Sequence, residues 1–236
     1  AQALSATVNS RIVRVIIAGG LALLFVGALR QIRSLKRDNR RLYELATRDG
    51  LTELRSRGWF QVNYPRFVER ANYPGHCLGL IMADINSFKA INDNHGHTAG
   101  DEVIRFVAKM LEAACRPGDA TVRYGGEEFV LILPDAPIQV VERICRVAEE
   151  TIRNTPVTLA DSRTVQVTVS FGGISRPGPN LDGPKLLQWA DDRLTRAKDL
   201  KGSGAPTIVA DSRRQRAPGF GALPIDVATP DPDETG

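Results

Sequence analysis

The chain has 236 residues, of which 42% are hydrophobic and 25% charged, and its net charge is +4. This length fits one globular domain of about 150 to 200 residues plus an additional segment, and the composition excludes collagen-like and disulfide-rich proteins. The basic excess lies mainly in residues 30–48, so nucleic acid is not expected as a partner of the rest. Cys77, Cys115 and Cys145 lack CxxC spacing and indicate reduced, cytosolic thiols.

An apolar stretch runs from Ile12 to Leu29, with one charged residue, Arg14, near its start. Its length predicts a single membrane-spanning helix. A secretory signal peptide is the alternative, but no small-residue cleavage pattern follows Leu29. Because the chain opens with Ala1 rather than Met, we expect residues 1–11 to be the juxtamembrane end of an upstream region. Basic residues are more numerous after the stretch than before it, which predicts a cytoplasmic location for the C-terminal side.

Apolar residues alternate at intervals of three and four between Phe25 and Ala46. This pattern predicts that residues 30–48 continue the membrane helix as a parallel coiled coil, with Asn39 at a position that fixes the register of two strands. An amphipathic helix lying on lipid headgroups is the alternative, since basic residues flank the pattern and the run is short.

Helical and strand patterns alternate through residues 49–210, which we expect to form the folded domain. Helices are expected at 59–70, 101–115, 138–154 and 185–198, and a further helical turn at Phe88. Strands are expected at 77–83, on both sides of Gly125-Gly126, at 165–171 and at Ile208. Interleaved helices and strands predict an α/β sandwich with one sheet. Residues 211–236, rich in Pro, Gly and Asp, are expected to be a disordered tail.

The stretch Val122–Leu133 places Gly125-Gly126-Glu127-Glu128 between two strand-like runs, which predicts a β-hairpin. Adjacent carboxylates at its tip repel each other unless a cation or solvent compensates. A functional hairpin and a purely structural one are both compatible with this pattern alone.

A second acidic position, Asp84, ends an apolar strand and precedes a helix that begins near Phe88. A carboxylate at this place is suited to bind a divalent cation, while the free N–H groups of the helix start bind phosphates. Asp84 as an ordinary helix N-cap is the alternative.

Taken together, these motifs resemble the GGDEF family, the bacterial diguanylate cyclases, in its GGEEF variant. The resemblance covers about residues 45–209. It rests on Asp49-Gly50-Leu51-Thr52, Asp84-Ile85-Asn86-Ser87-Phe88-Lys89, Ile91-Asn92-Asp93, Gly96-His97, Gly100-Asp101, Arg123 to Phe129, Val167 to Gly172, and Ala190-Asp191 with Ala197-Lys198. It implies a fold like the palm of nucleotidyl cyclases and polymerases, with a mostly antiparallel central sheet flanked by helices. The implied reaction condenses two GTP into cyclic di-GMP and two pyrophosphates.

The resemblance also implies roles for individual residues. Asp84, the backbone carbonyl of Ile85 and Glu127 match ligands for two Mg²⁺ ions, with Mn²⁺ as an alternative. Glu127 also matches a proton acceptor, and Glu128 supports the metal or the ribose. The expected nucleotide contacts are Asn92 and Asp101 for guanine, Lys89, Lys198 and the backbone of Ser87 and Phe88 for phosphates, and His97. A metal-binding pair of His95 and His97 is the less favoured reading of these histidines, because alternate residues on a helix face apart.

Each such site holds one GTP, so the resemblance implies a homodimer whose coiled coil sets how often the two half-sites meet. Arg116-Pro117-Gly118-Asp119 has the spacing of the family's RxxD motif, which implies inhibition by bound cyclic di-GMP. An ordinary turn is the alternative reading of these four residues. The implied location is the bacterial inner membrane, with the catalytic domain in the cytoplasm.

Several positions depart from the family pattern. Glu53 and Ser56 differ in the first motif, which affects the expected coupling between stalk and domain, and Thr195 replaces a common Tyr. After Lys198 an arginine that helps hold phosphate is missing, and Lys201 substitutes for it only in part. A catalytically silent module that senses GTP or cyclic di-GMP is therefore the alternative function. A cyclase for adenine or mixed dinucleotides is less favoured, because Asp101 is present.

Overall fold

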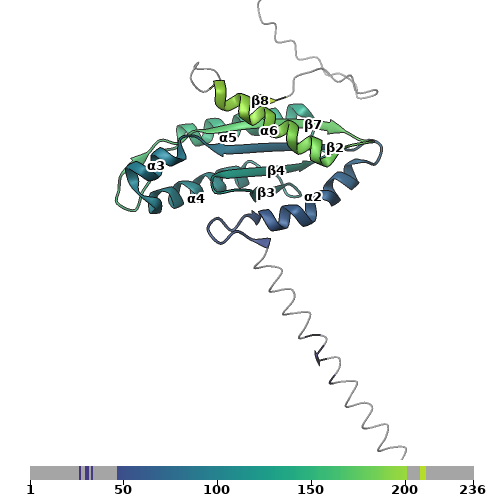
Figure 1. Cartoon of the computed structure of the whole chain (residues 1–236), viewed down its shortest axis with the longest axis horizontal. Coiled ribbons are helices and arrows are strands. Elements are labelled where there is room, and N and C mark those ends of the chain that lie inside the picture. Colours follow the sequence, from purple (N-terminus) through teal and green to yellow (C-terminus); the bar gives the residue numbers. More distant parts are fainter. Residues whose placement is uncertain (1–26, 28–29, 32, 34–46, 201–207, 211–236) are drawn as a thin grey trace, which may run out of the picture.

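The computed structural model describes residues 27, 30–31, 33, 47–200 and 208–210 (Figure 1). The predicted membrane helix, most of the predicted coiled coil and the predicted disordered tail lie outside the described residues. Among the residues that are described, no helix has the length and apolar character needed to cross a bilayer.

One six-stranded sheet forms the centre of the domain, with strand order β1-β3-β4-β2-β7-β8. The pairs β3-β4, β4-β2 and β2-β7 are antiparallel, whereas β1-β3 and β7-β8 are parallel. The strands are β1 (Arg55–Ser56), β2 (Cys77–Ile85), β3 (Ala120–Arg123), β4 (Glu128–Pro134), β7 (Val169–Pro177) and β8 (Ile208–Ala210), and a separate hairpin contains β5 (Val157–Thr158) and β6 (Thr164–Val165). The mostly antiparallel centre agrees with the fold that the sequence predicts.

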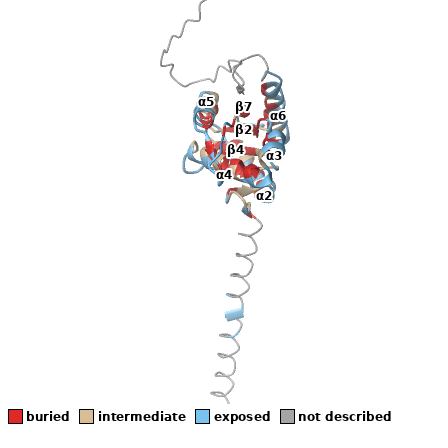
Figure 2. Cartoon of the chain, turned by 90° about the vertical axis from the view of Figure 1, so that its left-hand side faces the viewer, coloured by how far each residue is buried: buried red, intermediate tan, exposed pale blue. Residues whose placement is uncertain are grey.

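In the described part of the chain, the helices that cover the two faces of this sheet are α2 (Arg57–Ala71), α3 (Phe88–His95), α4 (His97–Ala113), α5 (Ile138–Asn154) and α6 (Gly183–Asp199). The buried strands lie between α4 and α5 on one side and α2 and α6 on the other (Figure 2). Both faces of β2 are therefore buried, with Ile81 facing α4 and α5, and Met82 facing α2 and α6. This double cover explains why β2 is a continuous apolar run in the sequence.

The close packing of α6 on β7 depends on a glycine. A Cβ at Gly172 would overlap backbone atoms of Ala190 and Leu194. The side chain of Asp182 caps the helix by accepting a hydrogen bond from the Lys185 N–H at 3.1 Å. These contacts fix α6 against the sheet, and with it Lys198 in the last turn of the helix.

The observed elements refine the predicted ones. α5 has the predicted bounds, whereas the strand predicted at 165–171 is divided into β6 and β7. The two parts pair with different strands: β6 pairs with β5 in the separate hairpin, and β7 pairs with β2 and β8 in the main sheet. The sequence does not reveal β1 or β5, since strands of two residues show no periodicity.

Candidate active site

The two acidic motifs meet at one edge of the sheet. Asp84 on β2 is the direct antiparallel partner of Glu128 on β4. The N–H of Ile85 also donates a hydrogen bond to the carbonyl of Glu127 at 3.2 Å. Paired residues project from the same face of a sheet, so Asp84 and Glu128 lie on the face covered by α2 and α6. The fold thus brings together carboxylates that are distant in the sequence.

Lys198 adds a positive charge to these carboxylates. Its Nζ lies 2.8 Å from Oδ2 of Asp84, whose side chain is 9% exposed, whereas the Lys198 side chain is 41% exposed. An ionised carboxylate with so little access to water needs such a partner, because an unpaired buried charge is costly.

The pKa of Glu127 is raised above its ordinary value. Burial of the carboxyl is the largest cause, followed by the negative charge of Asp84. Glu128 raises the pKa further, and Lys198 opposes these effects. Among the described residues, the charge of Lys198 offsets only one of these three carboxylates, so the site favours the binding of a cation.

The donor atoms at this edge fit a Mg²⁺ ion that is shared with a nucleotide. Asp84 and Glu127 supply carboxylate oxygens and Ile85 supplies a carbonyl, which are the hard ligands that Mg²⁺ prefers. Within the described ranges, no three His, Cys, Asp or Glu side chains form a metal-binding group by themselves. Mg²⁺ usually takes one or two carboxylates and completes its shell with water and substrate phosphates. A partial protein donor set in an acidic environment meets that requirement.

A buried network holds the connection between β2 and α3. The Asn86 N–H donates to the Thr168 carbonyl at 2.9 Å, and its amide group donates to the Thr168 hydroxyl at 3.1 Å. The Ser170 hydroxyl donates to Oδ1 of Asn86 at 2.8 Å. Ser87 then adopts a left-handed conformation with φ of 56° and does not cap α3 through its side chain. The first N–H groups of α3 are therefore presented just after Asp84, together with the exposed Lys89.

The two candidate guanine-reading residues lie on neighbouring helices. Asn92 belongs to α3, and its Oδ1 is buried without a hydrogen-bond partner in the described part of the chain. The helices approach closely here, because a Cβ at Gly100 would overlap that amide oxygen and crowd the ring of Phe88. Asp101 is exposed on α4, one residue beyond Gly100. An unpaired acceptor and a nearby carboxylate suit a base that carries N–H donors.

The two histidines on either side of Gly96 belong to different helices, which corrects the reading of both on one helix. His95 ends α3 and His97 begins α4, with Gly96 at φ of 85° between them. The described residues include no metal-binding group around either histidine, so the structure gives no support to a metal site there. His97 is exposed at the start of α4.

Comparison with known proteins assigns the chain to a family. Residues 46–203 match the family model described as diguanylate cyclase, GGDEF domain. The chain belongs to the GGDEF family.

The GGDEF domain has similar curated relatives and solved structures. Diguanylate cyclase VdcA of Vibrio cholerae is 35% identical over 175 residues, which are 72% of this chain and 49% of that protein. Response regulator PleD of Caulobacter vibrioides is 37% identical over 156 residues, which are 66% of this chain and 34% of that protein. The chain thus spans half or less of these relatives. The GGDEF domain of DgcB from Caulobacter crescentus, solved in complex with c-di-GMP, has a TM-score of 0.64 and 32% identity, and the match covers 70% of this chain and 95% of that one.

The RxxD segment of the GGDEF domain forms a turn at the end of β4 remote from Glu128. The Arg116 guanidinium donates to the Pro134 carbonyl at 2.6 Å, and the Arg116 N–H donates to Oδ2 of Asp119 at 3.0 Å. The length of β4 places this turn about 20 Å from the acidic edge. These four residues form the turn that is the alternative reading of the sequence, and the inhibitory role stays a prediction.

One contact at the hairpin is not indicated by the sequence. Nη1 of Arg123 lies 3.0 and 3.1 Å from the two carboxylate oxygens of Asp49, and Nη2 donates to the Gly126 carbonyl at 2.8 Å. Burial alone would raise the pKa of Asp49, but hydrogen bonds from Thr52 and Arg123 outweigh burial and lower it. Asp49 and Arg123 each occur in a recognised motif, but the sequence does not show that these motifs are in contact.

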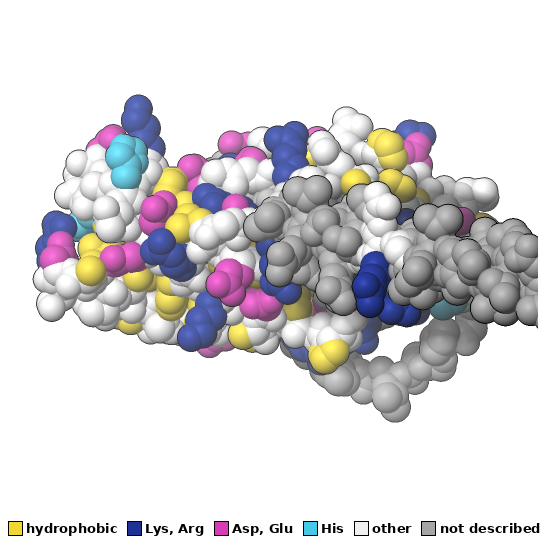
Figure 3. Space-filling model, turned by 90° about the horizontal axis from the view of Figure 1, so that it is seen from below, with side chains coloured by type: hydrophobic (Ala, Val, Ile, Leu, Met, Phe, Trp, Pro, Cys, Tyr) yellow, Lys and Arg dark blue, Asp and Glu magenta, His cyan; other side chains and the backbone are white. Residues whose placement is uncertain are grey.

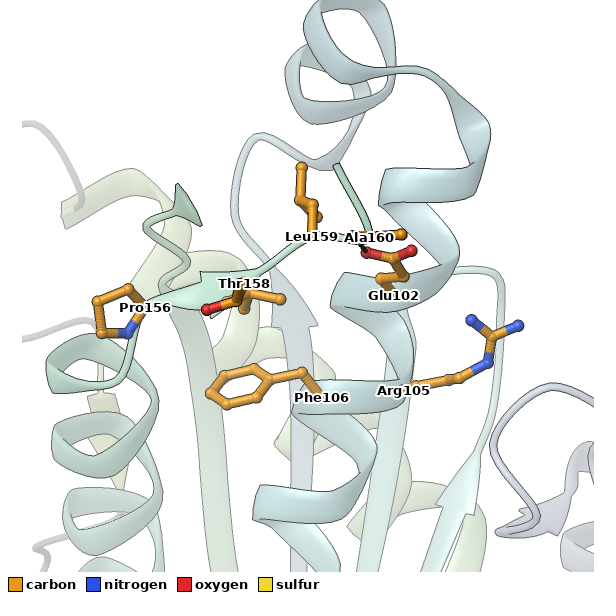
Figure 4. A pocket seen from close by; sticks show the side chains of 8 residues that line it. Glu102, Arg105, Phe106, Pro156, Thr158, Leu159 and Ala160 are labelled. Carbon is orange, nitrogen blue, oxygen red and sulfur yellow. Dashed lines mark hydrogen bonds between the residues drawn. The ribbon is translucent and has the colours of Figure 1, made fainter. Parts of the chain in front are cut away.

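The GGDEF domain also has an open pocket of about 440 Å³ away from the acidic edge. Figure 4 shows Phe106 pointing toward Thr158 and Pro156, while Glu102 accepts a hydrogen bond from the Ala160 N–H at 3.0 Å. None of the candidate site residues lines this pocket. On the face drawn in Figure 3, acidic and basic side chains are interspersed and do not form a patch of one sign.

Proposed function

We propose that the chain is a membrane-anchored diguanylate cyclase that condenses two GTP into cyclic di-GMP and releases two pyrophosphates. The observation that carries this proposal is the pairing of Asp84 with Glu128 beside Glu127, with Lys198 as the basic partner. Family membership supports the same reaction, and so does the name of the relative VdcA.

In the proposed reaction, Glu127 accepts the proton of the attacking 3′-hydroxyl. A raised carboxyl pKa makes Glu127 a better base than an ordinary glutamate. Asp84 and the Ile85 carbonyl hold the cation side of the site, and Glu128 adds negative charge on the same sheet face. When bound, two Mg²⁺ ions supply activation of the hydroxyl and neutralisation of phosphate charge.

The nucleotide is held by the remaining residues in this proposal. The N–H groups at the start of α3, with Lys89 and Lys198, bind the phosphates. Asn92 and Asp101 select guanine, since a carboxylate accepts from the N1–H and the amino group of guanine, and adenine lacks these donors on that edge. His97 contacts the nucleotide at the start of α4.

Each domain binds one GTP, so product formation in this proposal needs two domains facing each other. The predicted stalk in residues 30–48 would hold them together below a membrane helix at residues 12–29. Exchange of Asn39 for Leu tests this arrangement, because the change removes the polar residue that fixes the register. We expect altered cyclase activity together with altered oligomer order, and unchanged activity would contradict a signalling role of the stalk.

Incubation of the purified chain with GTP and Mg²⁺ tests the catalytic assignment. We expect cyclic di-GMP, no product with ATP, and no product from a variant with Glu127 and Glu128 both changed to Ala. The altered segment after Lys198, which lacks the arginine that helps hold phosphate in the family, favours the second candidate function, a silent sensing module. GTP binding without any product would establish that second function and refute the first.

A further inference from the structure

An arginine without an assigned role lies beside the hairpin. Arg57 is the first residue of α2, and its guanidinium carbon lies 4.9 Å from the centroid of the Tyr124 ring. The residue is exposed, and within the described part of the chain it forms no ion pair with a carboxylate. A guanidinium held by stacking alone keeps its hydrogen-bond donors available for a ligand.

Tyr124 connects this arginine to the acidic edge. The Tyr124 N–H donates to the carbonyl of Glu128 at 2.8 Å. Its ring is in edge contact with Phe60 of α2 at 5.2 Å and 83°. Tyr124 is therefore fixed between α2 and the hairpin, and it holds Arg57 beside the strand that carries Glu128.

Arg57 and Lys198 lie on opposite sides of the strand that carries Asp84. Lys198 belongs to α6, which packs on β7 at Gly172. Gly172 is the strand partner of Met82 on β2. Arg57 begins α2 next to Ser56, whose register partner is Arg123 on β3. In the sheet, β3 and β4 lie on one side of β2, and β7 lies on the other. Arg57 therefore lies on the β3 side of the strand that carries Asp84, and Lys198 lies on its β7 side.

We propose that Arg57 binds a phosphate of the nucleotide held by the opposing domain. This inference rests on the proposed cyclase function. Lys198 and the start of α3 already provide for the phosphates of the domain's own nucleotide. The opposing nucleotide must bring its α-phosphate to the hydroxyl beside Glu127, and its triphosphate then needs a cation on the open flank. Arg57 is an exposed guanidinium on that flank, held over the Tyr124 ring.

The step is balanced without a further reactant. The 3′-oxygen forms a bond with the opposing α-phosphorus, and the bond from that phosphorus to the pyrophosphate oxygen breaks. Glu127 takes the hydroxyl proton, and pyrophosphate leaves with the electron pair of the broken bond. Arg57 keeps its protons and contributes charge and orientation through paired N–H donors.

Steady-state kinetics of Arg57→Ala and Arg57→Lys provide the first test. Arg55→Ala is a matched control, because Arg55 lies in the same way over Trp59 at 5.2 Å, but that ring belongs to α2 and not to the hairpin. We expect Arg57→Ala to lower kcat by about 10²-fold, with Arg57→Lys in between and the control within about twofold. Binding of a non-hydrolysable GTP analogue should change by less than about twofold in all three.

Several outcomes would overturn the inference while leaving the cyclase function intact. One is full activity of Arg57→Ala in a preparation whose unaltered chain makes cyclic di-GMP. Another is a loss of analogue binding that matches the loss of kcat, which would assign Arg57 to its own nucleotide. If the unaltered chain makes no cyclic di-GMP, the proposed function is wrong and this inference is wrong with it.

Mixed dimers show whether Arg57 binds the nucleotide of its own domain or that of the opposing domain. This test does not require Arg57→Ala to be fully stable. Wild-type chain is first mixed with a large excess of the Arg57→Ala, Glu127→Gln double variant. In the mixed dimer the wild-type domain retains both Arg57 and Glu127, so it should form the first bond. The variant domain lacks both groups and cannot form the second bond, so the linear dinucleotide should accumulate. Arg57→Ala mixed with Glu127→Gln should form neither linear nor cyclic product above the Arg57→Ala background. The reverse pattern would show that Arg57 serves the nucleotide of its own domain.

Discussion

The ammonium group of Lys198 on α6 lies 2.8 Å from the carboxylate of Asp84 on β2. Asp84 is also the first of the proposed metal ligands, and Lys198 is one of the proposed phosphate ligands. A cation and a nucleotide that bind together would separate this ion pair. Asp84 would then bind the cation, and Lys198 would bind a phosphate. The ion pair therefore keeps a nearly buried carboxylate neutralised until the substrate arrives.

Exchange of Lys198 for Ala should move two affinities in opposite directions. GTP should bind about 10-fold more weakly, because a charge-assisted phosphate contact is lost. Mn²⁺ should bind more tightly to the nucleotide-free protein, because its competitor for Asp84 is absent. Calorimetry with each ligand measures both effects, and Lys185→Ala on the same helix is the control. A variant that loses affinity for both ligands would contradict the competition.

The raised pKa of Glu127 predicts a pH-dependent stability. A carboxyl with a raised pKa in the folded state is destabilising when ionised, so its stabilising effect is present below 4.5 and is lost as the pH rises through the raised value. Glu127→Gln should therefore raise Tm by about 1 to 3 °C near neutral pH and have no such effect below the ordinary pKa. Thermal denaturation with and without Mg²⁺ checks this, and a lower Tm at neutral pH would refute it.

The contact between Asp49 and Arg123 predicts a loss of stability that extends to the hairpin tip. Asp49→Asn should cost about 1 to 3 kcal/mol, because a carboxylate that accepts from Thr52 and Arg123 is replaced. Since the pKa of Asp49 is lowered, this stability is present above 3.8 and lost as the pH falls through the lowered value. Urea denaturation measures the loss in the free energy of unfolding. Hydrogen exchange of the Gly126 N–H measures the loss of protection at the hairpin tip.

An exposed pair provides the control for Asp49. Asp161 and Arg163 form a salt bridge at 2.6 Å with both side chains about half exposed. Asp161→Asn should therefore change the free energy of unfolding much less than Asp49→Asn does, because solvent screens an exposed pair. Equal effects at Asp49 and Asp161 would show that the Arg123 contact has no special importance.

Arg116→Ala tests the proposed product inhibition. Loss of the guanidinium should weaken inhibition by cyclic di-GMP about 10-fold or more, because a bidentate contact to guanine is worth about 1 to 3 kcal/mol. The initial rate should remain within about twofold, since the turn lies at the far end of β4. Progress curves with added product measure both quantities. Inhibition that is unchanged in Arg116→Ala would leave this segment as a turn only.

The sequence predicts the residues of the candidate site more completely than it predicts the elements of the fold. Asp84, Glu127 and Lys198 occur in motifs whose order indicates the family, and α5 is predicted at its observed bounds because its apolar face repeats with the helical period. Short strands and contacts between motifs cannot be predicted from periodicity or from the order of motifs. The division of the strand predicted at 165–171 is one example, since β6 pairs with β5 whereas β7 pairs with β2.

The sequence by itself determines the class of fold, the acidic and basic residues of the site and the family, because these depend on local periodicity and on residue types in order. Only the tertiary structure decides which groups are neighbours. Asp84 meets Glu128 through strand register, Lys198 reaches Asp84 because Gly172 admits α6, and Arg57 lies beside the hairpin through stacking on Tyr124. Each of these contacts joins segments that are far apart in the chain, and only the packing of helices on the sheet brings them together.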